Sequence, residues 1–150
     1  MSCDSLEELD TRDIPIGKLI IIISRAHTLY LNHHLDKLNI NASQLPLLFE
    51  ISNGINQSEI ASRCIIDKGA VARSIKKLED KGLISRTIDE NNRRQNKISL
   101  TAEGEEVLFK SKEILNNWEN EIFDNFENKE LLRGILKETA INSIAISNKG

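Results

Sequence analysis

The sequence predicts a mainly α-helical fold with one small β-hairpin, and three observations carry this prediction. Apolar residues recur every three or four positions over most of the 150 residues, which is typical of amphipathic helices. Between residues 84 and 100 the period becomes two, which is typical of half-exposed strands. Residues that cap helices stand at the boundaries between these segments. The length fits a single domain with a moderate core.

We expect residues 1–14 to form a flexible tail, because Asp, Glu and Ser are frequent before Pro15. A long helix should follow from Ile16 to Leu38. Its run from Leu19 to Ile23 is apolar on every side for more than one turn, which a single copy of the chain would hide only with difficulty. The simplest explanation for this apolar run is that a partner chain covers it.

The next helix opens near residues 41–44, either with a capping box on Asn41 or with Ser43 as its cap. The second choice places Pro46 in the first turn, where proline is tolerated. Four apolar residues then predict core positions: Leu45, Leu48, Phe49 and Ile51.

Two closely spaced helices come next. In the first, Asn56 and Glu59 have the spacing of a capping box, so we expect this helix to start near Gln57. Residues 64–66 are too apolar for a solvent loop and predict a short buried turn. The second helix must therefore lie close to the first.

The second helix is predicted over residues 68–81. Asp67 is a suitable N-cap, and Gly82 stands where a left-handed residue commonly ends a helix. The helix has one apolar stripe, formed by Val71, Ile75 and Leu78. Its other face offers cations and hydrogen-bond donors that suit phosphates and base edges: Lys68, Arg73, Ser74, Lys76 and Lys77.

A hairpin is predicted from Ile84 to Leu100. Turn-forming residues occupy positions 89–92, and a second strand returns from Gln95 until Thr101 caps another helix. The tip presents Arg93 and Arg94. Arginines at the tip of a two-stranded wing are well suited to a narrow minor groove of DNA.

The distribution of charge supports a DNA-binding region. The whole chain has a net charge of -3, but residues 63–97 hold ten of the 20 Lys and Arg and only five of the 23 Asp and Glu. This window is therefore +5 and the remainder -8. A lone basic helix is usually just a solvated face, but here the helix-turn-helix spacing and the arginine-tipped wing accompany it.

Two further helices should close the chain. The first runs for about 25 residues from Thr101, with Trp118 and Phe126 among its apolar residues, and Asn128 begins the last. Long terminal helices with apolar stripes and no second domain to cover them argue for intertwining between two protomers.

The predicted helix-turn-helix and wing resemble those of a known protein family. Residues 67–84, followed by Arg86, the pair Arg93-Arg94 and the run 100–104, resemble the MarR family of winged helix-turn-helix regulators. The family's order of elements accounts for nearly every residue from Pro15 to Ser147. The resemblance implies a homodimer on pseudo-palindromic operators in double-stranded DNA, with the second helix of the motif in the major groove and the wing in the minor groove.

In this scheme the whole chain is one MarR-like domain. Residues 15–40 and 102–147 are the dimerisation helices, and residues 41–101 are the winged helix-turn-helix. The residues expected to bind DNA are Gln57, Ser58, Lys68, Gly69, Ala70, Arg73, Ser74, Lys76, Lys77, Arg93, Arg94 and Lys97. One departure concerns Asn92, which stands where the family usually has an acidic residue before the wing arginine. An amide there offers no charge, so we expect a looser wing contact.

The resemblance also implies control by a small aromatic or phenolic carboxylate, which relieves the binding of a repressor to its operator. Such a ligand needs a cation and an aromatic neighbour, for which Arg25, Tyr30 and Arg86 are the choices. The alternatives are a salt bridge within the dimer for Arg25, and a wing-bracing or phosphate-binding role for Arg86.

The sequence speaks against other chemistry. Cys3 and Cys64 are too far apart for a zinc cage, the three histidines have no acidic or thiolate partner at ligand spacing, and we recognise no catalytic set. We therefore expect no enzyme, no metal site and no cofactor. We find no apolar run of 18 residues and no export signal, so we expect a cytoplasmic protein without membrane contact.

Two alternatives remain for the function. One is a winged-helix module that binds a protein, although the predicted recognition helix has no aromatic residue to favour it. The other is a regulator controlled by thiol oxidation. The neighbours of Cys64 are apolar, which favours inert packing over a reactive thiol. Cys3 is more accessible but has no evident resolving partner.

Overall fold

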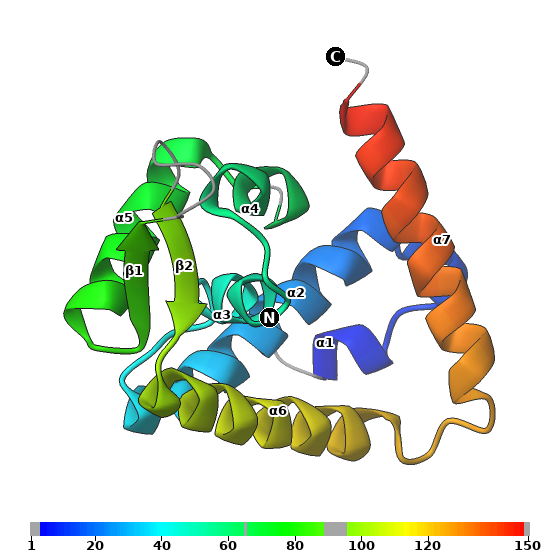
Figure 1. Cartoon of the computed structure of the whole chain (residues 1–150). Coiled ribbons are helices and arrows are strands. Elements are labelled where there is room, and N and C mark those ends of the chain that lie inside the picture. Colours follow the sequence, from blue (N-terminus) through cyan, green and yellow to red (C-terminus); the bar gives the residue numbers. More distant parts are fainter. Residues whose placement is uncertain (1–3, 65, 89–95, 149–150) are drawn as a thin grey trace. The chain divides into compact units, whose positions relative to one another are not determined.

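The computed structural model describes residues 4–64, 66–88 and 96–148. Its elements, in chain order, are α1 (Asp4–Glu7), η1 (Thr11–Asp13), α2 (Ile16–Leu35), η2 (Asp36–Leu38), α3 (Leu45–Ser52), α4 (Gln57–Cys64), α5 (Lys68–Asp80), β1 (Ile84–Ile88), β2 (Asn96–Leu100), α6 (Ala102–Phe123) and α7 (Lys129–Ser147) (Figure 1). The predicted fold class, mainly α with a small antiparallel hairpin, is confirmed.

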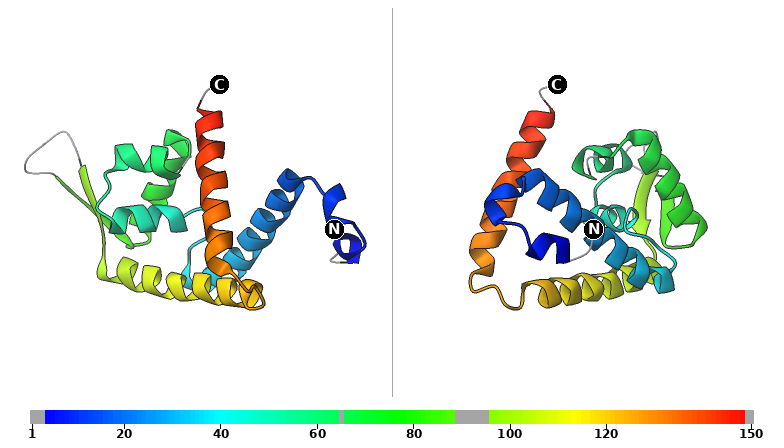
Figure 2. Two further views of the ribbon diagram at one scale, coloured as in Figure 1. Left: turned by 90° about the vertical axis from the view of Figure 1, so that its right-hand side faces the viewer. Right: turned by 180° about the vertical axis from the view of Figure 1, so that it is seen from behind.

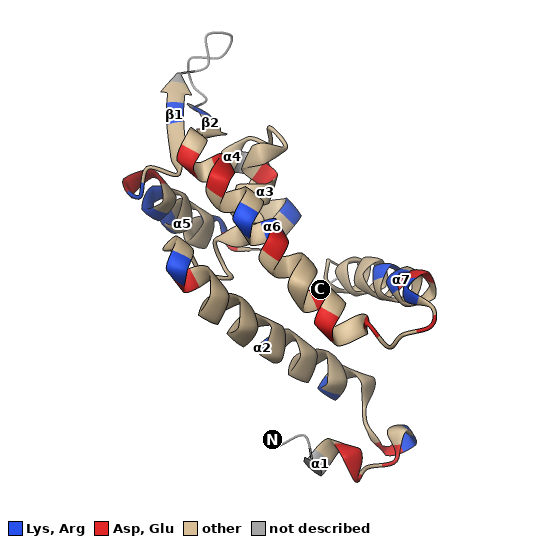
Figure 3. Ribbon diagram, turned by 90° about the horizontal axis from the view of Figure 1, so that it is seen from below, with Lys and Arg blue, Asp and Glu red and all other residues tan. Residues whose placement is uncertain are grey.

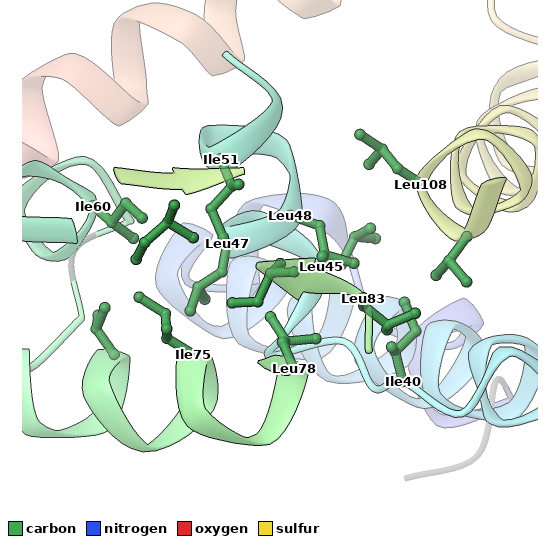
Figure 4. Close-up of a cluster of buried hydrophobic side chains, with 14 of the residues drawn as sticks. Ile40, Leu45, Leu47, Leu48, Ile51, Ile60, Ile75, Leu78, Leu83 and Leu108 are labelled. Atoms are coloured by element: carbon green, nitrogen blue, oxygen red, sulfur yellow. The ribbon is translucent and has the colours of Figure 1, made fainter. Parts of the chain in front are cut away.

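The chain divides into two compact units, residues 1–115 and residues 116–150. The core lies in the first unit, where side chains from α3 face those from α4 and α5 (Figure 4). Leu47, Leu48, Ile60, Ile75 and Leu78 are almost completely buried in it. Three of the four predicted core residues of α3 are buried, and Phe49 is half-buried.

The second unit contains the end of α6 and the whole of α7. The ring of Phe123 packs edge-on against both Trp118 and Phe126, at centroid distances of 5.7 and 5.4 Å. Asn128 caps α7 as predicted, because its side-chain oxygen accepts a hydrogen bond from the Leu131 N–H over 2.9 Å. Arg133 forms an ion pair with Glu119.

The sequence predicts a flexible tail over residues 1–14, and the structure describes short secondary structure in part of this segment. Within the described part, this segment contains the short helix α1 and the 3₁₀ turn η1, which precede α2 (Figure 2). Asp10 caps η1 by accepting a hydrogen bond from the Arg12 N–H, and its carboxylate also pairs with the Arg12 guanidinium over 2.7 Å. A local ion pair that composition alone does not reveal thus accompanies the turn.

The predicted helix from Ile16 to Leu38 is also shorter than expected. Regular α-helix ends at Leu35, and the last three residues form the 3₁₀ turn η2. The turn closes on Asn39, which has a left-handed φ of 56°. Asparagine tolerates this conformation better than most residues, which explains why the chain reverses here without a glycine.

The start of α3 shows the hydrogen bonds of the first predicted alternative. The Asn41 side-chain oxygen accepts from the N–H groups of Ser43 and Gln44, and the Gln44 side chain accepts from the Asn41 N–H over 3.2 Å. This is the reciprocal pairing of a capping box. Regular helix begins only at Leu45, so Pro46 still falls in the first turn.

No helix in the described part of the chain is long and apolar enough to cross a membrane.

Candidate nucleic-acid interface

Helices α4 and α5 form the predicted helix-turn-helix. The Asn56 side chain accepts a hydrogen bond from the Glu59 N–H over 3.1 Å at the start of α4. Asp67 accepts one from the Ala70 N–H over 3.0 Å at the start of α5. Both predicted caps are therefore present. Cys64 is the last residue of α4 rather than part of the turn after it.

The end of α5 is held equally firmly. Gly82 has a φ of +73°, and its N–H donates to the Glu79 carbonyl over 2.9 Å. The Leu83 N–H donates to the Leu78 carbonyl over 3.0 Å. These two bonds make a Schellman motif, which confirms the left-handed residue predicted at position 82. The helix is thus fixed at both ends.

The same junction carries the start of α6. The Thr101 N–H donates to the Leu83 carbonyl, the Thr101 hydroxyl donates to the Gly82 carbonyl over 2.6 Å, and the Gly104 N–H donates to the Thr101 hydroxyl. A Cβ atom on Gly104 would lie 1.9 Å from the Leu83 carbonyl oxygen. Only glycine permits this approach of the two backbones.

Helix α5 carries several Lys and Arg residues along its length (Figure 3), and those among the predicted DNA-binding residues are exposed. Its stripe of Val71, Ile75 and Leu78 is buried as predicted. Most of the residues predicted to read DNA lie exposed or half-buried on α5: Lys68, Gly69, Ala70, Arg73, Ser74, Lys76 and Lys77. Amphipathic packing therefore turns the cations outward.

Lys76 differs from the other cations of this face. Its ammonium group donates to Asp80 one turn later over 2.7 Å. That hydrogen bond and the charge of Asp80 raise the pKa of Lys76. The lysine stays charged, and an acid of the same helix already pairs with it.

Gly69 leaves room for Arg73. A Cβ atom at Gly69 would lie 3.0 Å from the Asp67 carboxylate and 3.4 Å from an Arg73 guanidinium nitrogen. The guanidinium group therefore lies back along the first turn of α5, beside the cap. This is the end of a recognition helix that contacts base edges in helix-turn-helix proteins.

The wing strands pair antiparallel, with Arg86 opposite Ile98 and Thr87 opposite Lys97. The Lys97 side chain is exposed. Three further predicted contacts, Ser58 by its side chain and Arg93 and Arg94 entirely, lie outside the described residues, as does Asn92.

Gln57 has a partner within the protein. Its side-chain oxygen accepts from the Arg86 guanidinium over 3.4 Å. Arg86 also donates to the Glu79 carboxylate over 3.1 Å. The sequence predicted neither bond, because Glu79 and Gln57 lie 7 and 29 positions from Arg86 and only the fold brings the three together. Of the roles considered for Arg86, these bonds match the bracing of the wing.

The three predicted ligand residues have different surroundings. Arg25 is exposed on α2, the Tyr30 ring lies 4.2 Å from that of His34, and Arg86 is engaged as above. A hollow of about 470 Å³ lies elsewhere in the first unit, between the end of α3, β2 and the start of α6. Its lining includes Phe109 and two lysines, Lys97 and Lys112.

Sequence reasoning missed Phe109, which is 64% exposed, and Lys112, whose ammonium group lies 5.7 Å from the centre of the Phe49 ring. It also missed Lys81, which donates to the Asn39 carbonyl and ties the end of α5 to the turn after η2. The signal available in the sequence was the position of Lys81, directly before the glycine that ends the helix.

Cys64 is half-buried, and burial followed by the negative charge of Glu50 raises the pKa of its thiol. A raised pKa leaves less thiolate at neutral pH, so the thiol is less reactive. Among the described residues, no group of three or more His, Cys, Asp and Glu side chains is placed to hold a metal ion.

A capped basic helix packed on a shorter helix and followed by a two-stranded wing defines a winged helix-turn-helix protein. The family model of the MarR family matches residues 40–95. The multiple antibiotic resistance protein MarR of Salmonella typhimurium is 31% identical over 102 residues, which are 67% of this chain and 71% of that protein. The chain belongs to the MarR family, whose members are transcriptional regulators and not enzymes.

Solved structures agree. A crystal structure of MarR superposes with a TM-score of 0.79 at 31% identity, covering 95% of this chain and all of that one. A mutant MarR from E. coli complexed with operator DNA superposes with a TM-score of 0.73 at 26% identity, covering 87% of this chain and 99% of that one.

Proposed function

We propose that this protein is a homodimeric, sequence-specific repressor that places α5 in the major groove of an operator and its wing in the minor groove. The observation that carries the proposal is the outward face of α5, where Lys68, Arg73 and Lys77 are exposed on a helix fixed at both ends. The similarity to a MarR complexed with operator DNA supports it.

Exposed apolar side chains support the dimer. On α2, Ile16, Ile20, Ile21, Ile23 and Leu29 are 47–74% exposed. None of the described residues of α7 is buried, although six of them are large and apolar: Leu131, Ile135, Leu136, Ile141, Ile144 and Ile146. Apolar surfaces of this extent mark interaction sites in soluble proteins. We therefore assign residues 15–40 and 102–147 to dimerisation and residues 41–101 to DNA binding.

Dimerisation also suits the nucleic acid. Two copies of α5 held about 34 Å apart would read two half-sites one helical turn apart. Each copy adds its own phosphate contacts, so a modest affinity per half-site becomes a useful affinity for the whole operator.

Relief of binding by a small aromatic carboxylate is the second part of the proposal. Arg25 is the remaining predicted cation, because the Arg86 guanidinium is engaged by Glu79 and Gln57. The ligand would favour a half-site spacing that no longer matches the major grooves. The extent to which the ligand can shift the dimer between its two forms is limited by the difference between its affinities for them.

Fluorescence anisotropy tests both parts. The purified protein is titrated with the DNA upstream of its own gene and with a scrambled duplex, at one stated salt concentration, with and without salicylate. Preference for the upstream duplex by a factor of about 10³ or more supports specific binding, and its loss with salicylate supports the effector. Equal weak binding to the upstream duplex, the scrambled duplex and a pool of random sequences contradicts specific DNA binding.

A further inference from the structure

Arg86 joins three elements of the DNA-binding region. It stands in the middle of β1, donates through Nε to the Glu79 carboxylate near the end of α5, and donates through a terminal nitrogen to Gln57, the first residue of α4. The wing is thereby bonded to both helices of the helix-turn-helix.

The side chains of this ion pair are both partly buried. The side chains of Arg86 and Glu79 are 28% and 32% exposed. Partial burial reduces screening by salt. The planar guanidinium group donates in fixed directions, so two bonds to two helices restrict the orientation of the strand as well as its distance.

The base of the hairpin is fixed in a different way. Backbone hydrogen bonds tie Leu83 to Leu78 and Thr101 to Leu83. Arg86 lies further along β1 than this base, in the middle of the strand. A rotation about the base would move the strand at Arg86, and the bonds of Arg86 oppose that rotation.

We propose that Arg86 is a positioning residue, which acts through Glu79 and Gln57 to set the angle between the wing and α5 and so contributes to operator affinity without touching DNA. Gln57 then serves the protein's own geometry rather than a phosphate. This inference rests on the proposed DNA binding. It names the residues that align α5 with the wing.

A substitution of Glu79 distinguishes this role of Arg86 from a phosphate contact. If Arg86 bound a phosphate, removing the acid that balances its charge would leave operator affinity unchanged or raise it. If Arg86 positions the wing, removing the acid lowers operator affinity. The Glu79→Gln variant therefore gives opposite results under the two roles.

The experiment uses a duplex that the full-length wild-type protein selects from a random-sequence pool. We expect Glu79→Gln and Arg86→Lys each to weaken binding to it by about tenfold, since each loses charge-assisted bonds. The slope of log affinity against log salt should stay as in wild type. A lost phosphate contact would instead reduce that slope by about 0.9 for Arg86→Gln, and Arg86→Lys would bind nearly as wild type.

Chemical protection of the bound duplex distinguishes positioning from general loss of structure. Glu79→Gln should keep the protection of guanine N7 atoms in the major groove, where α5 lies, and lose the protection from hydroxyl radicals in the minor groove, where the wing lies. Equal loss at both places would show a general structural role and overturn the proposal, as would wild-type affinity of Glu79→Gln.

Asp80→Asn is the matched control. It removes the neighbouring acid of the same helix, which pairs with Lys76 rather than with the wing. We expect it to bind the duplex as tightly as wild type or slightly more tightly. If wild type itself selects no duplex, the proposed function fails. If wild type binds and Glu79→Gln binds equally well, only the role of Arg86 fails.

Discussion

At the scale of single residues, Gly104 is a position where a Cβ atom does not fit. Its missing Cβ lets the first turn of α6 lie against the Leu83 carbonyl. We expect Gly104→Ala to lower the free energy of unfolding by about 1–3 kcal/mol, because one of the two backbones must move. Thermal or urea unfolding measures this change. Gly134→Ala is the control, since a Cβ there meets nothing within 4 Å. It should be neutral or stabilising, and equal losses in both variants would contradict the packing argument.

Arg73 and Lys77 should differ in what they contribute to DNA binding. Arg73 lies beside the cap of α5, at the end that faces the bases in the proposed complex, so Arg73→Ala should relax the preference at one base by about 1–3 kcal/mol. Lys77 lies in the last turn, and Lys77→Ala should weaken all sequences alike and flatten the salt dependence. Binding to duplexes with single base changes measures both. If both variants weakened every sequence equally, the direct-readout role of Arg73 would be wrong.

Cys64 should react slowly at neutral pH. Burial and the Glu50 carboxylate raise its pKa, so the reactive thiolate forms only as the pH rises above the range of a free cysteine. Alkylation of the Cys3→Ser variant, followed against pH beside a short cysteine peptide, measures this shift. We also expect DNA binding to survive peroxide. Fast alkylation at pH 7 together with peroxide-induced release of DNA would restore the thiol-controlled alternative.

At the scale of elements, the N-cap of α5 should contribute both to the stability of the protein and to its affinity for operator DNA. Asp67→Ala removes the acceptor for the Ala70 N–H and should cost about 1 kcal/mol of stability. Asp67→Asn keeps an acceptor and should stay near the wild-type stability. Because α5 carries the proposed recognition residues, fraying of its first turn should also weaken operator binding in the alanine variant. Unfolding curves and anisotropy titrations on the three proteins test this order.

The elements were largely predictable because their signals are local. Caps such as Asn56, Asp67 and Asn128 and the glycine at position 82 act within a few residues, so the chain displays them directly. The 3₁₀ turn after Asp10 was not predicted, and the end of α2 was predicted less well. Composition does not show the ion pair of Asp10 with Arg12, and the left-handed Asn39 ends the helix without the usual glycine.

The site was predictable only in part, for a related reason. The face of α5 follows from helical periodicity, so its exposed cations could be named from the sequence. The bonds of Arg86 join residues 7 and 29 positions away along the chain, and only the fold brings them together. The sequence therefore suggested three roles for Arg86, and geometry was needed to favour one.

At the scale of the whole molecule, the central prediction is that the apolar faces of α2 and α7 are covered by a second copy. Ile135 is 54% exposed in the single chain, on a helix with no buried residue among those described. Ile135→Glu would place a charge in the proposed interface twice, once from each copy. If each copy loses about 2 kcal/mol of the free energy gained by burying apolar surface, dimerisation weakens by about a thousandfold.

Sedimentation analysis measures this directly, with anisotropy on the same samples. Ile135→Glu should be monomeric at concentrations where wild type is a dimer, and it should bind a single half-site as wild-type monomer would while losing the affinity for a full operator. Lys137→Glu, also exposed on α7, alters charge on the same helix without removing apolar area and should remain dimeric. A dimeric Ile135→Glu protein that binds operator normally would mean that α7 faces something other than its own copy. The recognition helices would then be paired through α2 alone.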